Sequence, residues 1–106
     1  MKKYRLENFT RGWIVGDFEP SVMRTKTFEF MVRPYVAGDR EQKHVHKIAD
    51  EITVIVSGKF KMNDDLLESG DIVHLSLGES ADFECIENGA TSVIKAPSVM
   101  GDKYLL

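Results

Sequence analysis

The sequence contains little cysteine, proline or tryptophan: one, three and one residue of these types among 106. Because Cys85 is the only cysteine, no intramolecular disulfide is possible, which excludes a disulfide-stapled scaffold and favours a reducing, cytoplasmic location. Apolar residues make up 42% and charged residues 29% of the chain, values that argue against disorder. The length predicts a single domain over residues 1–106.

Positive charge and long apolar runs are also scarce. The formal net charge is -3 and no basic stripe is present, so we expect no nucleic-acid partner. Lys2, Lys3 and Arg5 are not followed by an apolar stretch of signal-peptide length, and no run is long enough to span a bilayer. These absences favour a protein without a membrane partner.

No segment shows a convincing helical period, whereas short segments of alternating apolar and polar residues recur. Phe28, Phe30 and Val32 alternate with charged residues, which predicts a half-buried strand with the apolar side chains on the buried face. Asn88-Gly89 is the strongest hairpin signal. Further strands are expected over residues 52–56, 59–62, 72–75, 82–86 and 91–96. Short strands separated by turn residues predict an antiparallel all-β sandwich or barrel.

The candidate functional residues lie in one stretch between two glycines. Gly38, His44, His46, Glu51 and Gly58 are separated by five, one, four and six residues. Residues two apart on a strand point to the same face, so the two imidazoles are expected to share one space. If the following β-branched run pairs with this strand, the Glu51 carboxylate meets both rings. Two neutral imidazoles and a carboxylate suit a first-row divalent metal ion.

This spacing resembles the first conserved motif of the cupin superfamily at all five of its defining positions. The resemblance implies an antiparallel double-stranded β-helix, or jelly-roll barrel, with a cupin core over about residues 28–97 and an N-terminal strand or coil segment over 1–27. It implies a metal site at His44, His46 and Glu51. It leaves function open, because cupins include dioxygenases, isomerases, epimerases, storage proteins and sensors.

The second cupin motif is only partly present, between Gly70 and Gly78. The proline of that motif is Ser76 here, its histidine is Ala81, and its asparagine is Cys85. A metal ion, whether iron, manganese, nickel or zinc, would therefore have three protein ligands and more open positions than in a typical cupin. This is the ligand composition of the non-haem iron facial triad.

Other residues have both a functional and a structural interpretation. His74 is a candidate replacement ligand, but a core or surface histidine is favoured. Cys85 is a candidate ligand, but a small buried residue is favoured. A last group could line a ligand pocket, although core packing is favoured: Trp13, Tyr35, Phe60 and Met62.

Three functions are compatible with the sequence. The first is a metal-dependent enzyme acting on a small molecule inside the barrel, with dioxygenase-like or sugar isomerase or epimerase-like chemistry; no general base can be named. The second is a non-catalytic module that binds a small ligand with or without metal. The third is a structural cupin that acts as a scaffold.

A homodimer is expected from the face of the strand that carries Glu51. If Glu51 points into the barrel, then Ile52, Val54 and Val56 point out of it. Three β-branched apolar residues on one outer face require a cover. The candidates are the N-terminal segment, the tail at residues 104–106, or a second copy of the chain.

Overall fold

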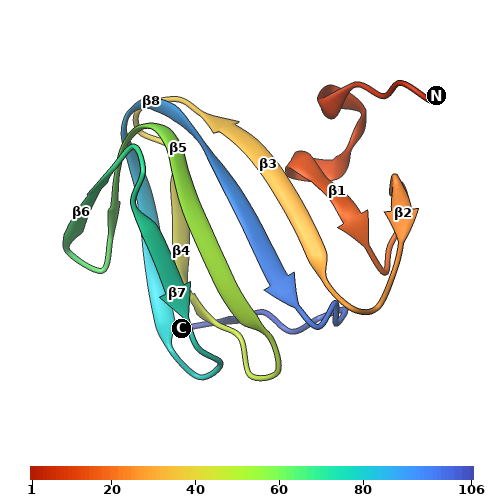
Figure 1. The fold of residues 1–106 in the computed structure, drawn as a ribbon. Coiled ribbons are helices and arrows are strands. Elements are labelled where there is room, and N and C mark those ends of the chain that lie inside the picture. The colour runs from red at the N-terminus through yellow and green to blue at the C-terminus, as the bar shows by residue number, and fades with distance from the viewer.

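The computed structural model describes all residues from Met1 to Leu106 and consists mainly of β-strands (Figure 1). Two single 3₁₀ turns precede the strands, and neither has the length or the apolar character needed to cross a membrane. In chain order the elements are η1 (Leu6–Asn8), η2 (Thr10–Gly12), β1 (Trp13–Gly16), β2 (Met23–Arg24), β3 (Glu29–Tyr35), β4 (Arg40–Val45), β5 (Asp50–Met62), β6 (Asp65–Glu68), β7 (Ile72–Leu75), β8 (Ser80–Ala96) and β9 (Tyr104–Leu105).

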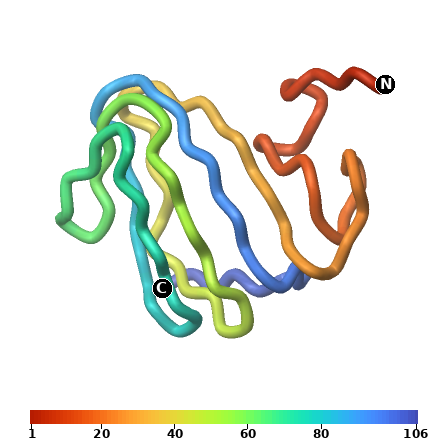
Figure 2. The backbone as a smooth tube through the Cα atoms, in the orientation of Figure 1, coloured from red at the N-terminus to blue at the C-terminus, as the bar shows by residue number.

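The 17-residue strand β8 is the centre of the sheet. The first part of β8 pairs with β4 and the second part with β3, while β5 pairs along most of its other side. The strands β6 and β7 both pair with β5, and β1 pairs with β3. Because β8 and β5 bend together, the two parts of the sheet face each other as two layers (Figures 1 and 2).

The predicted antiparallel double-stranded β-helix is confirmed, with one difference. The sheet does not close into a complete barrel, since its path ends at β2 on one side and at β9 on the other. The pair β1–β2 is parallel, whereas every other pair is antiparallel.

The predicted hairpin at Asn88-Gly89 is wrong, because β8 continues through both residues. A Cβ on Gly89 would lie 2.0 Å from the carbonyl oxygen of Ser57, so the glycine allows two backbones to touch where β5 and β8 bend. Gly58 fills the same role from the other strand and has a positive φ of 83°. The Asn88 side chain accepts a hydrogen bond from the Ala37 amide at 2.7 Å. The glycine signal therefore marks a bend at which two paired strands approach closely.

The apolar core occupies one end of the space between the layers. Phe60 and Phe83 stack with ring centroids 4.9 Å apart, and Tyr35 meets both rings edge-on. Each buried aromatic ring contributes about 1.5–3 kcal/mol to stability. Cys85 is 1% exposed in this cluster, which confirms the prediction of a small buried residue. Burial also raises the pKa of the Cys85 thiol, so the thiolate is disfavoured.

The predicted buried face of β3 is wrong. The residues that point into the molecule are Glu29, Met31 and Tyr35, each at most 8% exposed, while Phe30 lies on the outer face. Residues of β3 do alternate between the two faces, as predicted, but the face that points inward lines a polar cavity and not an apolar core. A glutamate with charged and hydroxyl partners therefore replaces the expected apolar residue.

The outward direction of Ile52, Val54 and Val56 is confirmed. Thr53 and Ile55 are 4% and 0% exposed, whereas Ile52 and Val56 are 39% and 54% exposed. Apolar residues also stand on the same outer face in the neighbouring strands: Phe30, Ile72 and Ile94.

Candidate metal centre

The two predicted histidines come together at the end of β4. His44 lies in this strand and His46 directly follows its last residue, Val45. The ring centroids are 5.1 Å apart and both rings face the interior. His44 is partly buried and His46 is 6% exposed. The spacing of two residues therefore places both imidazoles as predicted.

Backbone carbonyls orient both rings. The Nδ1 atom of His44 lies 2.9 Å from the carbonyl oxygen of Gln42, and Nδ1 of His46 contacts the carbonyl oxygen of Asp102. A carbonyl oxygen only accepts hydrogen bonds, so each Nδ1 carries the proton. In the neutral form of each ring, Nε2 then carries the lone pair, which is the tautomer that a metal ligand requires.

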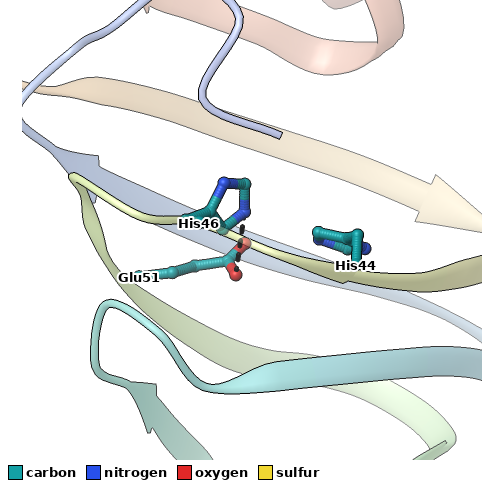
Figure 3. Close-up of side chains that lie close together, drawn as sticks. All are labelled: His44, His46 and Glu51. Carbon is teal, nitrogen blue, oxygen red and sulfur yellow. Dashed lines mark ion pairs between the residues drawn. The ribbon is translucent and has the colours of Figure 1, made fainter. Parts of the chain in front are cut away.

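Glu51 reaches the histidines by a different route from the predicted one. The strands β4 and β5 do not pair with each other; each pairs with β8, and the turn after His46 leads directly to Glu51. Its Oε2 atom lies 3.8 Å from Nε2 of His46 (Figure 3). One ligand atom each from His44, His46 and Glu51 lies within 4.8 Å of the others. This separation suits three ligands of one ion.

Burial governs the ionisation of these groups. It lowers the pKa of His46, and the positive charge of Lys95 acts in the same direction. Burial raises the pKa of Glu51, while Lys95 opposes this shift. His46 is therefore neutral at pH 7, in the form that binds metal.

Asp102 supports the centre and was missed by sequence reasoning. Its carboxylate accepts hydrogen bonds from the amides of Lys47, Ile48 and Ala49 at 2.9–3.2 Å, while its backbone carbonyl holds His46. The residue is 3% exposed and fixes the whole turn between His46 and Glu51. The only sequence signal was an aspartate after Gly101 in a short irregular segment, and its partners lie more than 50 residues away.

The three candidate ligands stand on the wall of a cavity of about 360 Å³. Apolar residues that include Trp13, Met31 and Val93 contribute to this wall. Ala81 also lines it and is the direct cross-strand partner of His44 on β8. The methyl group of Ala81 leaves open the side from which a fourth ligand would project.

Two ion pairs also line the cavity. The Lys95 Nζ atom lies 3.0 Å from Oε1 of Glu29, and both side chains are 11% exposed. Arg33 Nη1 lies 3.4 Å from Oε1 of Glu41, with both side chains 29% exposed. None of these four residues stands out in the sequence as a candidate site residue.

The remaining candidates divide between the surface, the cavity and the core. His74 points away from the cavity, with a side chain 57% exposed near Asp50. Trp13, Tyr35 and Met62 line the cavity, whereas Phe60 belongs only to the core. The structural interpretation was therefore correct for His74 and Phe60.

Comparisons with known proteins identify the fold. No family model and no curated protein matches the chain. Among solved structures, an uncharacterised protein with a double-stranded β-helix domain from Klebsiella pneumoniae is similar with a TM-score of 0.72 and 20% identity, covering 99% of this chain and 96% of that one. An RmlC-like cupin from Shewanella frigidimarina has a TM-score of 0.66 and 17% identity, covering 74% and 72%.

An enzyme is also among these structures. Oxalate decarboxylase from Bacillus subtilis, a protein with Mn(II) centres, is similar with a TM-score of 0.67 and 13% identity, covering 77% of this chain and 25% of the enzyme. At these identities the likeness establishes the shared fold.

Proposed function

The chain has the cupin fold, and from this premise we propose that it binds one divalent metal ion and acts as an enzyme on a small molecule in its cavity. The observation that carries the proposal is the cluster of His44, His46 and Glu51, whose ligand atoms lie within 4.8 Å of one another on the cavity wall. Backbone carbonyls occupy Nδ1 of both histidines, so each neutral ring would bind an ion through Nε2.

The donor set fits a first-row divalent ion: iron, manganese, nickel or zinc. When bound, such an ion supplies Lewis-acid polarisation of a substrate oxygen or, if redox-active, activation of oxygen. The Mn(II) centres of the structurally similar oxalate decarboxylase support a metal in this fold.

The residues of the chain itself would position the small molecule. Ala81 leaves room beside His44, so substrate and ligands share the cavity. The side chains of His46 and Glu51 are only 7% and 15% exposed, and this burial strengthens electrostatic interactions at the centre. Dioxygenase-like and sugar isomerase or epimerase-like reactions both agree with this arrangement.

Metal analysis tests the centre. The purified protein is stripped with a chelator, loaded with Fe²⁺, Mn²⁺, Ni²⁺ and Zn²⁺ in turn, dialysed and measured by elemental analysis. We expect about one ion per chain for at least one metal. The double variant His44→Ala, His46→Ala should fold and lose it, while the control His74→Ala, altered at an exposed histidine outside the cavity, should retain it. A wild type that retains none of the metals contradicts the proposal.

A ligand-binding module without chemistry is the second candidate. One observation supports it: three carboxylates on the cavity wall are already engaged, Glu29 by Lys95, Glu41 by Arg33, and Asp102 by backbone amides. Such groups are poor general bases. A small molecule that binds the metal-loaded protein and is recovered unchanged, in the presence and absence of oxygen, supports this candidate over the enzyme.

Self-association through the outer face is also part of the proposal. Ile52, Ile72 and Ile94 are 39%, 67% and 37% exposed on this face. The N-terminal strand β1 extends the sheet beside β3, and β9 pairs with β4, so neither terminus supplies the cover. A second copy of the chain remains, and burying this face would stabilise a homodimer.

Sedimentation equilibrium at micromolar concentration tests the homodimer. The wild type should show the dimer mass, and Val54→Lys should shift it toward the monomer because the variant buries an unpaired charge. Leu66→Lys, at an exposed apolar position on β6, is the control and should remain dimeric. We further propose that residues 1–106 form one domain, since strands from both ends of this sequence join one sheet. We also propose a cytoplasmic location, which agrees with the single, unpaired Cys85.

A further inference from the structure

Three charged residues form a row across the inner face of the sheet. Lys95 on β8 is the direct register partner of Glu51 on β5 and of Glu29 on β3. All three line the same cavity. Direct partners on one face of a sheet have Cβ atoms about 4.5–5.5 Å apart. The Lys95 side chain therefore stands beside a proposed metal ligand.

The ammonium group of Lys95 is held in place. Its Nζ atom lies 3.0 Å from Oε1 of Glu29, and Ser98 donates a hydrogen bond at 2.8 Å to the other oxygen of that carboxylate. The Trp13 ring lies beside it, with its centroid 5.5 Å from Nζ. An ammonium group has three N–H donors, and the single Glu29 oxygen occupies one of them. The other donors are available to a molecule in the cavity.

Stability alone does not account for this pair. Desolvating two charges costs about as much as their attraction returns, so two apolar residues would serve packing equally well. The pair instead lies on the wall of a cavity of about 360 Å³, next to Glu51. A preorganised charge in such a place binds a charged group with little loss of side-chain entropy.

The charges around the centre select the sign of that group. Lys95 and Glu29 neutralise each other, as do Arg33 and Glu41. The Asp102 carboxylate and the Lys103 ammonium group, which also line the cavity, carry opposite charges and offset each other. Glu51 neutralises one of the two charges of a divalent ion, so one positive charge remains at the centre, which a monoanion balances. We propose that the cavity binds a small monocarboxylate. Its carboxylate would contact the Lys95 ammonium group and occupy the space faced by His44, His46 and Glu51. This inference rests on the proposed metal centre.

Calorimetric titration of the zinc-loaded protein with glycolate tests the inference. Ethylene glycol is the neutral counterpart of this probe and sulfate is the dianionic one. Zinc content is measured first for every variant, so that loss of the metal is recognised before any anion is added. The variants are Lys95→Met and the double change Glu29→Gln with Lys95→Met, which removes both charges if the single variant does not fold. Lys59→Met, at a lysine 57% exposed on the surface, is the control.

We expect the wild type and Lys59→Met to bind glycolate more tightly than ethylene glycol or sulfate. Loss of one charge-assisted contact should weaken glycolate binding about ten- to a hundredfold in both Lys95 variants, with zinc retained. Zinc-loaded wild type that does not bind glycolate, equal affinities in the wild type and the folded Lys95 variants, or tighter binding of sulfate would each overturn the inference. A wild type that retains none of the four metals would overturn the metal centre itself; if it retains another of them but not zinc, the titration is carried out with that metal.

Discussion

Replacing Asp102 by alanine is expected to destabilise the protein and weaken metal binding together. The change removes the carboxylate that accepts hydrogen bonds from the amides of Lys47, Ile48 and Ala49. Hydrogen bonds to a charged group contribute about 1.5–3 kcal/mol each, and they are not additive. Because Asp102 is 3% exposed, we expect a loss of about 3–5 kcal/mol, a large part of the stability of a small domain.

Urea denaturation of the metal-free protein measures this loss. With a typical urea dependence for a small domain, the midpoint should fall by about 2 M. Asp102→Asn should lie between the wild type and Asp102→Ala, since an amide oxygen still accepts hydrogen bonds but carries no charge. Asp65→Ala removes an exposed carboxylate on β6 and should leave the midpoint within error.

The effect has a defined pH dependence. Burial acts to raise the pKa of Asp102, but the hydrogen bonds from the three turn amides together outweigh it and lower the pKa. A carboxyl whose pKa is lower in the folded state stabilises the protein above its unfolded pKa, about 3.9, and loses this contribution as pH falls through the folded value. The difference between the wild type and Asp102→Ala should therefore shrink in acid.

The metal site provides a second readout. If the turn positions the ligands, Asp102→Ala should bind zinc at least about tenfold more weakly under conditions where it is folded. Unchanged urea midpoint and unchanged zinc affinity in Asp102→Ala would refute the reasoning. A large stability loss with full zinc affinity would limit the role of Asp102 to the fold.

Three further predictions follow from single contacts. Ala81→His should tighten metal binding in a chelator competition assay, because the new imidazole would stand directly opposite His44; unchanged affinity would mean that the cavity excludes the ring. Gly89→Ala should destabilise the fold by about 1–3 kcal/mol or more in the same urea assay, because its Cβ would lie 2.0 Å from the Ser57 carbonyl oxygen, and a neutral result would contradict the close approach of the two strands. Burial, aided by Glu41, raises the pKa of Tyr35 to about 12, so its stabilising contribution should be complete below about pH 10 and lost as pH rises through 12; a phenol that titrates near 10 in the folded protein by ultraviolet absorbance would contradict this.

Local patterns predicted the parts of the site that strand geometry dictates. The spacing of His44 and His46 correctly predicted that both rings lie on one side of β4. The alternation of side chains along β5 correctly predicted that Glu51 points inward, while Ile52 and Val54 point outward. Such inferences need only the period of a strand. The structure agrees with them because nothing distant in the sequence alters the period.

Other features depend on distant partners and gave no readable signal. Asp102 acts on a turn more than 50 residues away, and Lys95 meets Glu29 only because β3 and β8 pair. The hairpin prediction at Gly89 was wrong because a glycine in a hairpin turn and a glycine where two paired strands approach closely look alike in sequence. The buried face of β3 is the one opposite to that predicted, because the buried Glu29 side chain meets Lys95 and Ser98, which lie far from it in the sequence.

The position of Asp102 in the chain also sets the order in which the site can mature. The His46 codon is translated 56 residues before that of Asp102, and β4 has no strand partner until β8 has been made. A nascent chain that already exposes His44, His46 and Glu51 therefore lacks both the sheet and the Asp102 hydrogen bonds that arrange these residues. Long-range pairing of this kind also makes folding slow compared with local structure. If the proposed centre binds a metal ion, the ion should therefore be captured only after Asp102 has been synthesised, and earlier intermediates should offer it loose, exchangeable ligands.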